Sequence, residues 1–184
     1  MKSLLILILP FLLFGISESQ LQILQMAYNI GKSTVADDGM TFEQTAASIA
    51  LVESSAGLRL IGDQGINGKL RNASMGVMQV RLSTAKEVIK KDQRMNKYFS
   101  HLLHSDQKLI SMLLGNHRFN LLISLTYLRM QYDYALLLGY PKPYFRAISR
   151  YNGGNYNTLY FNRVIKARRL VQKLITNGTL KVLQ

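Results

Sequence analysis

The chain has 184 residues, of which 48% are hydrophobic, and its 23 Lys and Arg against 10 Asp and Glu give a formal charge of +13 at pH 7. This length and apolar content predict one folded domain and exclude a disordered chain. The charge favours an anionic partner such as nucleic acid, anionic lipid or a polyanionic cell wall, with a merely soluble basic surface as the alternative. No Cys is present, which excludes disulfides, thiolate catalysis, cysteine–zinc sites and a lipoprotein anchor.

The first 19 residues are typical of a signal peptide. Lys2 supplies a positive charge, residues 4–14 form an apolar stretch, and the small residues Ser17 and Ser19 follow it. The stretch is about half of the ~20 residues that span a bilayer, so we expect cleavage near the Ser19–Gln20 bond and export to the periplasm or the medium. An uncleaved anchor or a buried helix is the alternative. An exported protein meets the wall and the membrane, so we expect no nucleic-acid partner and membrane contact only through this segment.

In the rest of the chain, apolar residues recur at helical spacing, which predicts a single all-α domain. The expected helices cover about 20–30, 41–54, 84–91, 106–114, 116–138, 144–150 and 158–176. The second starts with a capping-box pattern formed by Thr41 and Gln44. Ser83 or Thr84 is suited to cap the third helix, and Ser105 to cap the fourth.

The segment 116–138 is expected to be the central buried helix, because it is long, apolar and free of proline. It contains Arg129, Gln131 and Asp133, which argue against a membrane span. Residues 57–73 are rich in Gly, Asp and Asn and are expected to form an exposed loop.

Glu53 is the candidate catalytic residue. It stands at the end of an apolar helix and faces a glycine-rich loop, where partial burial disfavours a charged carboxylate and raises its pKa. A raised pKa keeps a carboxyl group protonated near neutral pH, as a general acid requires. A glutamate at a solvated helix end is the simpler interpretation of this segment taken by itself.

Three later segments carry residues that suit a sugar ligand. In 74–80, a glycine permits close backbone approach, a methionine offers an apolar wall, and a glutamine offers both a donor and an acceptor. Segments 150–155 and 160–164 supply tyrosines that stack on sugar rings and asparagines that bind amides and hydroxyls. Each segment alone is equally compatible with an ordinary helix start or turn.

Taken in order, the four segments resemble the catalytic domain of the soluble lytic transglycosylases, glycoside hydrolase family 23, which has a lysozyme-like fold. Glu-Ser ends a helix, Gly-x-Met-Gln follows about 20 residues later, then Tyr-Asn-Gly-Gly about 70 residues further on, and finally Tyr-Phe-x-x-Val. The resemblance extends over about 40–170, within a catalytic domain expected at 20–184.

The resemblance implies a role for particular residues. Glu53 matches the family's catalytic glutamate, and Tyr160 matches a tyrosine that lies over the catalytic carboxyl group. The substrate-binding residues implied by the matching segments are Ser54, Gly76, Met78, Gln79, Tyr151, Asn152, Gly154 and Tyr160.

A lytic transglycosylase cleaves the β-1,4 bond between N-acetylmuramic acid and N-acetylglucosamine and forms a 1,6-anhydro ring. The resemblance therefore implies peptidoglycan glycan strands as the partner of a monomeric enzyme without a cofactor, with a secretion or pilus assembly complex as a further candidate partner. No metal site is expected, because His101 and His104 have helical spacing but no third ligand at a convincing distance.

Other functions stay open. A hydrolase similar to goose-type lysozyme needs a second carboxylate to activate water, for which Asp63 is the first candidate and Asp37 and Asp38 are weaker ones. A peptidoglycan-binding assembly protein that keeps the groove without the activity is a second alternative. A membrane-active basic protein is a third, for which only the cationic C-terminal helix is suited.

Overall fold

The computed structural model describes residues 15–63 and 69–182. The predicted all-α fold is confirmed, since the structure is 69% helical, and the described residues form eight α-helices and only a two-stranded sheet. Residues 1–14 of the predicted signal peptide (1–19) lie outside the described residues. None of the described helices is long and apolar enough to cross a membrane.

The elements follow one another along the chain with short connections. They are α2 (Glu18–Ser33), α3 (Glu43–Ser54), η1 (Leu70–Asn72), β1 (Ser74–Met75), β2 (Val80–Arg81), α4 (Leu82–Lys91), α5 (Gln93–Phe99), η2 (Ser100–His104), α6 (Asp106–Gly115), α7 (His117–Leu137), α8 (Pro143–Tyr151) and α9 (Thr158–Thr176).

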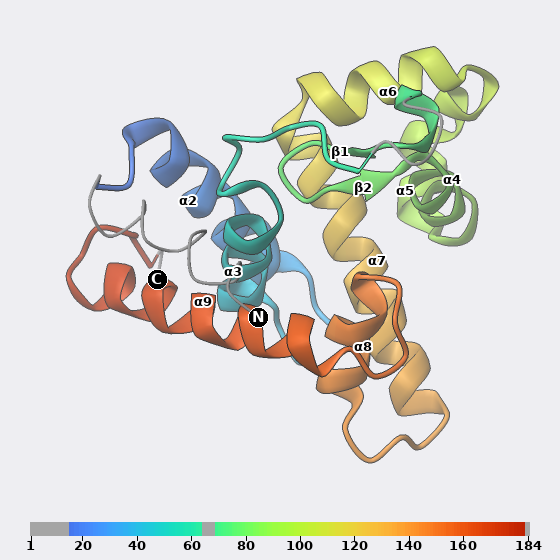
Figure 1. The fold of residues 1–184 in the computed structure, drawn as a ribbon. Helices are drawn as coiled ribbons and strands as arrows, with labels where there is room; N and C mark the ends of the chain where they lie inside the picture. Colours follow the sequence, from blue (N-terminus) through green and yellow to red (C-terminus); the bar gives the residue numbers. More distant parts are fainter. Residues whose placement is uncertain (1–14, 64–68, 183–184) are drawn as a thin grey trace, which may run out of the picture.

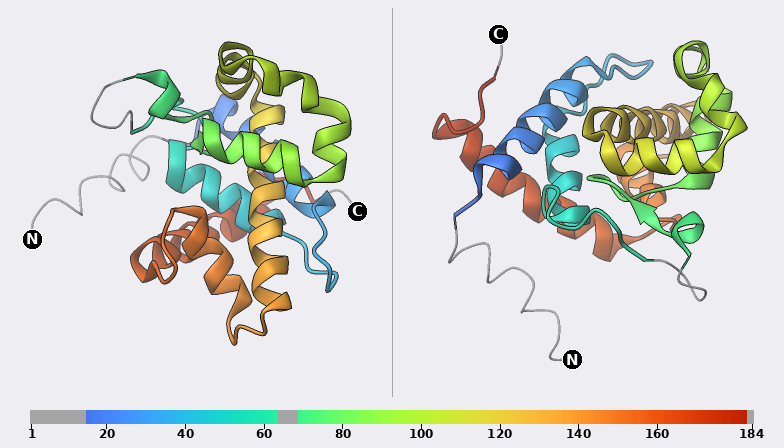
Figure 2. Two further views of the ribbon diagram at one scale, coloured as in Figure 1. Left: turned by 90° about the vertical axis from the view of Figure 1, so that its right-hand side faces the viewer. Right: turned by 90° about the horizontal axis from the view of Figure 1, so that it is seen from above.

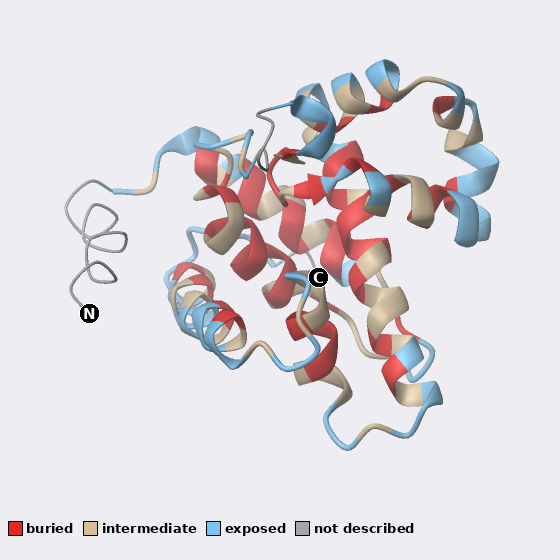
Figure 3. Ribbon diagram, turned by 45° about the vertical axis from the view of Figure 1, so that its right-hand side comes forward, coloured by how far each residue is buried: buried red, intermediate tan, exposed pale blue. Residues whose placement is uncertain are grey.

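The helices form two groups joined by α7 (Figure 1). In one group α3 packs between α2 and α9, and in the other α4, α5 and α6 surround the start of α7. The far end of α7 packs against α8, and both further views show α7 extending from one group to the other (Figure 2). Buried residues concentrate on α3, α7 and the strands (Figure 3). The predicted central helix is therefore confirmed as α7, which starts where Asn116 accepts a hydrogen bond from Phe119 N at 2.9 Å.

The first helix is longer than expected and begins before the predicted cleavage bond. Ser17 caps α2 in a capping box with Gln20, whose backbone N–H lies 3.3 Å from Ser17 Oγ. The predicted boundary after Ser19 thus falls in the first turn of α2.

The prediction of a capping box at Thr41 and Gln44 is wrong. The residue before α3 is Phe42, no side chain caps the helix, and Thr41 instead pairs with Val35 in an isolated bridge. Phe42 is 1% exposed and packs edge-on to Tyr132 at 5.6 Å between ring centroids. Burying a phenyl ring stabilises by about 2 kcal/mol or more, whereas a cap contributes about 1 kcal/mol, so packing decides where α3 starts.

The caps of the next helices were predicted with mixed success. Ser83 and Thr84 lie inside α4, which begins at the buried Leu82 directly after β2, so neither residue caps it. Ser105 does cap α6, accepting from Lys108 N at 3.3 Å. Helix α5, the 3₁₀ helix η2 and the β1–β2 hairpin were not predicted from the sequence.

The predicted loop 57–73 is partly attached to the hairpin. β1 and β2 are antiparallel, with Ser74 opposite Arg81. Ser74 also donates its N–H to Asp63 O at 3.0 Å and accepts from Gly62 N at 2.9 Å, while Ile61 forms a bridge with Met75. These bonds fix the end of the loop beside the end of α3.

Candidate functional site

Glu53 sits in the last turn of α3, where the chain makes an abrupt reversal. Ser55 and Ala56 have φ values of 55° and 52°, and Gly57 has 92°. A non-glycine residue in this left-handed region costs about 1 kcal/mol or more. The reversal is closed by hydrogen bonds from Ser55 N to Leu51 O at 3.1 Å and from Ala56 N to Ala50 O at 2.9 Å. It leaves the Glu53 side chain at the edge of a cleft.

Ser54 holds this reversal against the hairpin instead of binding a ligand. Its hydroxyl donates to Val77 O at 2.7 Å and accepts from Gly57 N at 2.8 Å, and the residue is 1% exposed. The predicted substrate contact of Ser54 is therefore replaced by a positioning role, because its polar atoms are already bonded and buried.

Tyr160 donates its hydroxyl to Glu53 Oε1 at 2.5 Å. Burial raises the pKa of the Glu53 carboxyl, and the hydrogen bond from Tyr160 and the charge of Arg163 oppose this without reversing it. Burial and the neighbouring Glu53 carboxylate also raise the pKa of Tyr160 well above its usual value. The tyrosine therefore remains a hydrogen-bond donor to the carboxyl group.

Tyr160 reaches Glu53 because α9 starts at the right place. Asn157 precedes α9 and its side chain accepts from Tyr160 N at 3.0 Å, which fixes the first turn of the helix. Since α9 packs along α3, the first turn of one helix meets the last turn of the other.

Gly76 and Met78 shape the turn between β1 and β2. Gly76 has a φ of +75°, and a Cβ there would lie 2.2 Å from Asn120 Nδ2. The buried Asn120 side chain donates to Met75 O at 2.8 Å and Leu113 O at 3.1 Å, and it accepts from Met78 N at 2.9 Å. Met78 itself is fully buried. The predicted substrate contacts of Gly76 and Met78 are thus corrected to support of the turn behind the cleft.

Gln79 lines the cleft, but its amide is largely committed to the protein. Nε2 donates to Gly76 O at 2.9 Å and Arg59 O at 3.1 Å, and Oε1 accepts from Ser74 Oγ at 2.8 Å. A Cβ on Gly62 would lie 1.9 Å from the same Oε1. Gln79 therefore links the loop to the hairpin and its turn. Both Nε2 hydrogens are used in these contacts, so only the second lone pair of Oε1 is left for a ligand.

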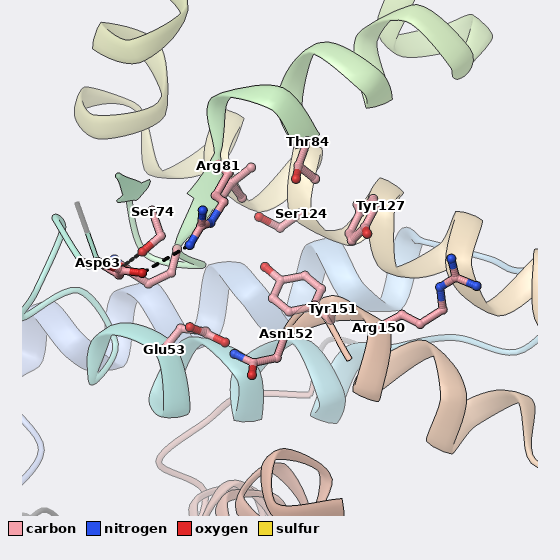
Figure 4. Close-up of a pocket in the computed structure, with 14 residues that line it drawn as sticks. Glu53, Asp63, Ser74, Arg81, Thr84, Ser124, Tyr127, Arg150, Tyr151 and Asn152 are labelled. Atoms are coloured by element: carbon pink, nitrogen blue, oxygen red, sulfur yellow. Dashed lines mark hydrogen bonds and ion pairs between the residues drawn. The ribbon is translucent and has the colours of Figure 1, made fainter. Parts of the chain in front are cut away.

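Tyr151 and Asn152 enter the cleft from the end of α8 (Figure 4). The Tyr151 hydroxyl donates to Met78 O at 2.7 Å, and burial raises the pKa of Tyr151 strongly. Gly153 lines the cleft, whereas the predicted Gly154 does not. The reason is that Gly154 N turns back to Ser149 O at 3.2 Å.

The cleft has a volume of about 600 Å³ and lies between α3, the hairpin, α7 and the end of α8. Six of its polar residues were not predicted as site residues: Ser74, Arg81, Thr84, Ser124, Tyr127 and Arg150. The Tyr127 ring packs 6.1 Å from the Tyr151 ring. Ser124 and Tyr127 are three residues apart and so share one face of α7, but a hydroxyl and a tyrosine on a buried helix give no signal in a single sequence.

Asp63 is the only one of the three alternative carboxylates that lines the cleft with Glu53. Its side chain is 71% exposed and pairs with Arg81 Nη2 at 3.2 Å. Asp38 instead accepts from the Tyr132 hydroxyl at 2.8 Å, and Asp37 N–H donates to Asp133. Both of these lie beside the second half of α7.

Among the described residues, no group of three or more His, Cys, Asp or Glu side chains is placed to hold a metal ion. The site is thus a partly buried carboxyl group, held by a tyrosine, in a cleft lined with hydroxyls, amides and arginines. No family model, curated protein or solved structure matches the chain.

Proposed function

We propose that this protein is a peptidoglycan lytic transglycosylase in which Glu53 acts first as an acid and then as a base. The observation that carries the proposal is the partly buried Glu53 carboxyl, with a raised pKa and a hydrogen bond from Tyr160, at the edge of a polar cleft. A protonated carboxyl group in such a setting can transfer a proton to a leaving oxygen.

The first step is cleavage of the β-1,4 bond between N-acetylmuramic acid and N-acetylglucosamine. Glu53 gives its proton to the glycosidic oxygen, and the bond from that oxygen to C1 of the muramic acid breaks. Positive charge develops at C1 and is stabilised by the substrate's own N-acetyl group or by polar groups near the carboxyl.

The second step closes the 1,6-anhydro ring. The Glu53 carboxylate takes the proton from the C6 hydroxyl of the muramic acid, and that oxygen bonds to C1. No water is consumed, and Glu53 ends the cycle protonated as it began. Because the attacking hydroxyl belongs to the same sugar, its effective concentration is high and the reaction can outrun hydrolysis.

A hydrolase is the second candidate, because Asp63 lines the same cleft as Glu53. An inverting mechanism would use the Asp63 carboxylate to activate water on the opposite face of the sugar. Asp63 is otherwise engaged in an exposed ion pair with Arg81.

The proposed enzyme acts outside the cytoplasm, in keeping with the predicted signal peptide, and as a monomer on glycan strands. The size of a single domain suits local remodelling of the wall, including openings for a secretion or pilus complex.

The test is mass spectrometry of the sugars released from purified peptidoglycan by the protein without residues 1–14. Anhydromuramyl ends are expected, and they are lighter than reducing ends by one water. Reducing ends would favour the hydrolase with Asp63. A folded wild-type protein that releases nothing while binding the polymer would favour the assembly protein, and Glu53→Gln protein is the control for contaminating activity.

A further inference from the structure

Arg146 on α8 is a buried cation between two tyrosine rings. Its guanidinium carbon lies 3.9 Å from the ring centroid of Tyr140 and 4.8 Å from that of Tyr156. The residue is 8% exposed, and its buried Nε has no hydrogen-bond partner. A guanidinium stacked in this way keeps its planar edge for a ligand while its faces are covered.

No carboxylate of the described residues forms an ion pair with Arg146. The whole segment 134–184 contains no Asp or Glu but has Lys and Arg throughout. A buried charge without a partner is unfavourable, and the two stacked rings offset only part of that cost. An anion from outside the chain would complete this site.

Arg146 lies one helical turn away from a residue that lines the cleft. Arg150 lines the cleft, and Arg146 precedes it by one helical turn on the same face of α8, about 6 Å along the helix axis. Arg150 is also placed over a tyrosine, with its guanidinium carbon 5.6 Å from the Tyr134 ring centroid. The two arginines thus form a row that extends from the cleft along α8.

We propose that Arg146, between Tyr140 and Tyr156, binds a carboxylate of the peptide that muramic acid carries. This inference rests on the proposed function, because it assigns the part of peptidoglycan that leaves the cleft beside Arg150. The ligand chemistry is a planar carboxylate, which the two parallel N–H groups of a guanidinium bind through paired hydrogen bonds. The glycan itself has no such group once its muramic acid is substituted by the peptide.

Binding to the inactive Glu53→Gln protein tests this without turnover. Isothermal titration compares a muramic-acid glycan that carries its peptide with the same glycan from which an amidase has removed the peptide and whose lactyl carboxyl has been amidated. We expect the peptide-bearing glycan to bind about tenfold more tightly, as a charged hydrogen-bonded pair provides. Adding Arg146→Gln should remove that difference and leave the affinity for the bare glycan unchanged.

Three controls separate the roles of charge, geometry and folding. Arg169→Gln removes the same charge from an exposed position on α9 that does not line the cleft, and it should keep the preference. Arg146→Lys keeps the positive charge but lacks the planar guanidinium, so it should lose most of the preference for the peptide-bearing glycan. Tyr156→Leu changes a residue that is 68% exposed, so the core stays intact while the guanidinium loses one stacking face and the preference falls.

Each result has one meaning. Equal affinity for the two glycans, or a preference that survives Arg146→Gln, overturns the assignment of Arg146 while the proposed function stands. A loss of preference in Arg169→Gln as large as in Arg146→Gln also overturns it, in favour of general electrostatic attraction. Binding of neither glycan contradicts the proposed function and this inference together.

Discussion

The Tyr160 hydroxyl donates to the Glu53 carboxyl across 107 residues of sequence, at 2.5 Å. This contact joins the first turn of α9 to the last turn of α3. It lowers the pKa of Glu53 while burial raises it, and burial dominates. The balance sets the pH range in which Glu53 holds its proton.

Tyr160→Phe removes the group that lowers the Glu53 pKa, so that pKa should rise further. The general acid acts when protonated, so activity is present below this pKa and is lost as pH increases through it. We expect the alkaline limit of activity to move to higher pH and the maximal rate to fall about tenfold, which corresponds to about 1.4 kcal/mol, the usual contribution of one hydrogen bond. The measurement is the rate of product release against pH.

Tyr144→Phe is the matched control for that substitution. It removes a hydroxyl hydrogen-bonded to Thr45 Oγ1 at 2.7 Å, and Tyr144 does not line the cleft. Its pH profile should equal that of the wild type. An alkaline limit that stays in place in Tyr160→Phe would show that Glu53 is not the titrating acid.

Glu53→Gln should abolish cleavage and make the protein more stable at neutral pH. The folded-state pKa of Glu53 is raised above its unfolded value, so ionisation opposes folding above the unfolded pKa. Gln cannot ionise and still accepts from Tyr160. The gain in melting temperature should therefore be full above the folded pKa, shrink as pH falls, and vanish below the unfolded value of about 4.3.

Thermal unfolding at pH 4 and pH 8 measures this difference. Glu87→Gln is the control, since Glu87 forms a surface pair with Lys91 at 2.7 Å and its substitution should give no such gain. A Glu53→Gln protein that is less stable at pH 8 than the wild type would contradict the assigned electrostatics, even if its activity is lost.

Asp63→Asn should reduce activity less than threefold if Glu53 works alone, because an exposed ion pair contributes little to stability or positioning. The ratio of anhydro to reducing ends should not change. A loss of a hundredfold or more with an unchanged melting temperature would instead identify Asp63 as the base that activates water. Arg81→Gln, which removes its partner, shows how much of any effect comes from the pair.

Gly76→Ala should destabilise the protein by about 2–4 kcal/mol, since the new Cβ meets a buried side chain and the backbone is left-handed. The predicted Cβ position is 2.2 Å from Asn120 Nδ2 and 2.4 Å from Leu113 O. Denaturant unfolding measures the change. Gly115→Ala, where nothing lies within 4 Å of the new Cβ, should be neutral, and an equal effect at both positions would contradict the packing argument.

The sequence alone determined the elements whose signal is local and long. Apolar spacing without proline over 116–138 was sufficient to predict α7. The last helix, expected over 158–176, is likewise observed as α9 from Thr158 to Thr176. Both helices depend on residues that are close together in the sequence, so they can be predicted from the sequence alone. Glu53 was singled out only when its helix end was taken together with the three later segments that complete the resemblance.

Tertiary structure decided the roles of the side chains. Ser54, Gly76 and Met78 were predicted to touch substrate, but all three support the hairpin behind the cleft. Ser54 donates to Val77 O, and Asn120, more than 40 residues away from Gly76 and Met78, occupies the space beside both. The same long-range packing brings Tyr127 into the cleft and leaves Arg146 between two tyrosines. Burial and long-range hydrogen bonding depend on residues that are far apart in the sequence. A single segment of sequence therefore does not determine them.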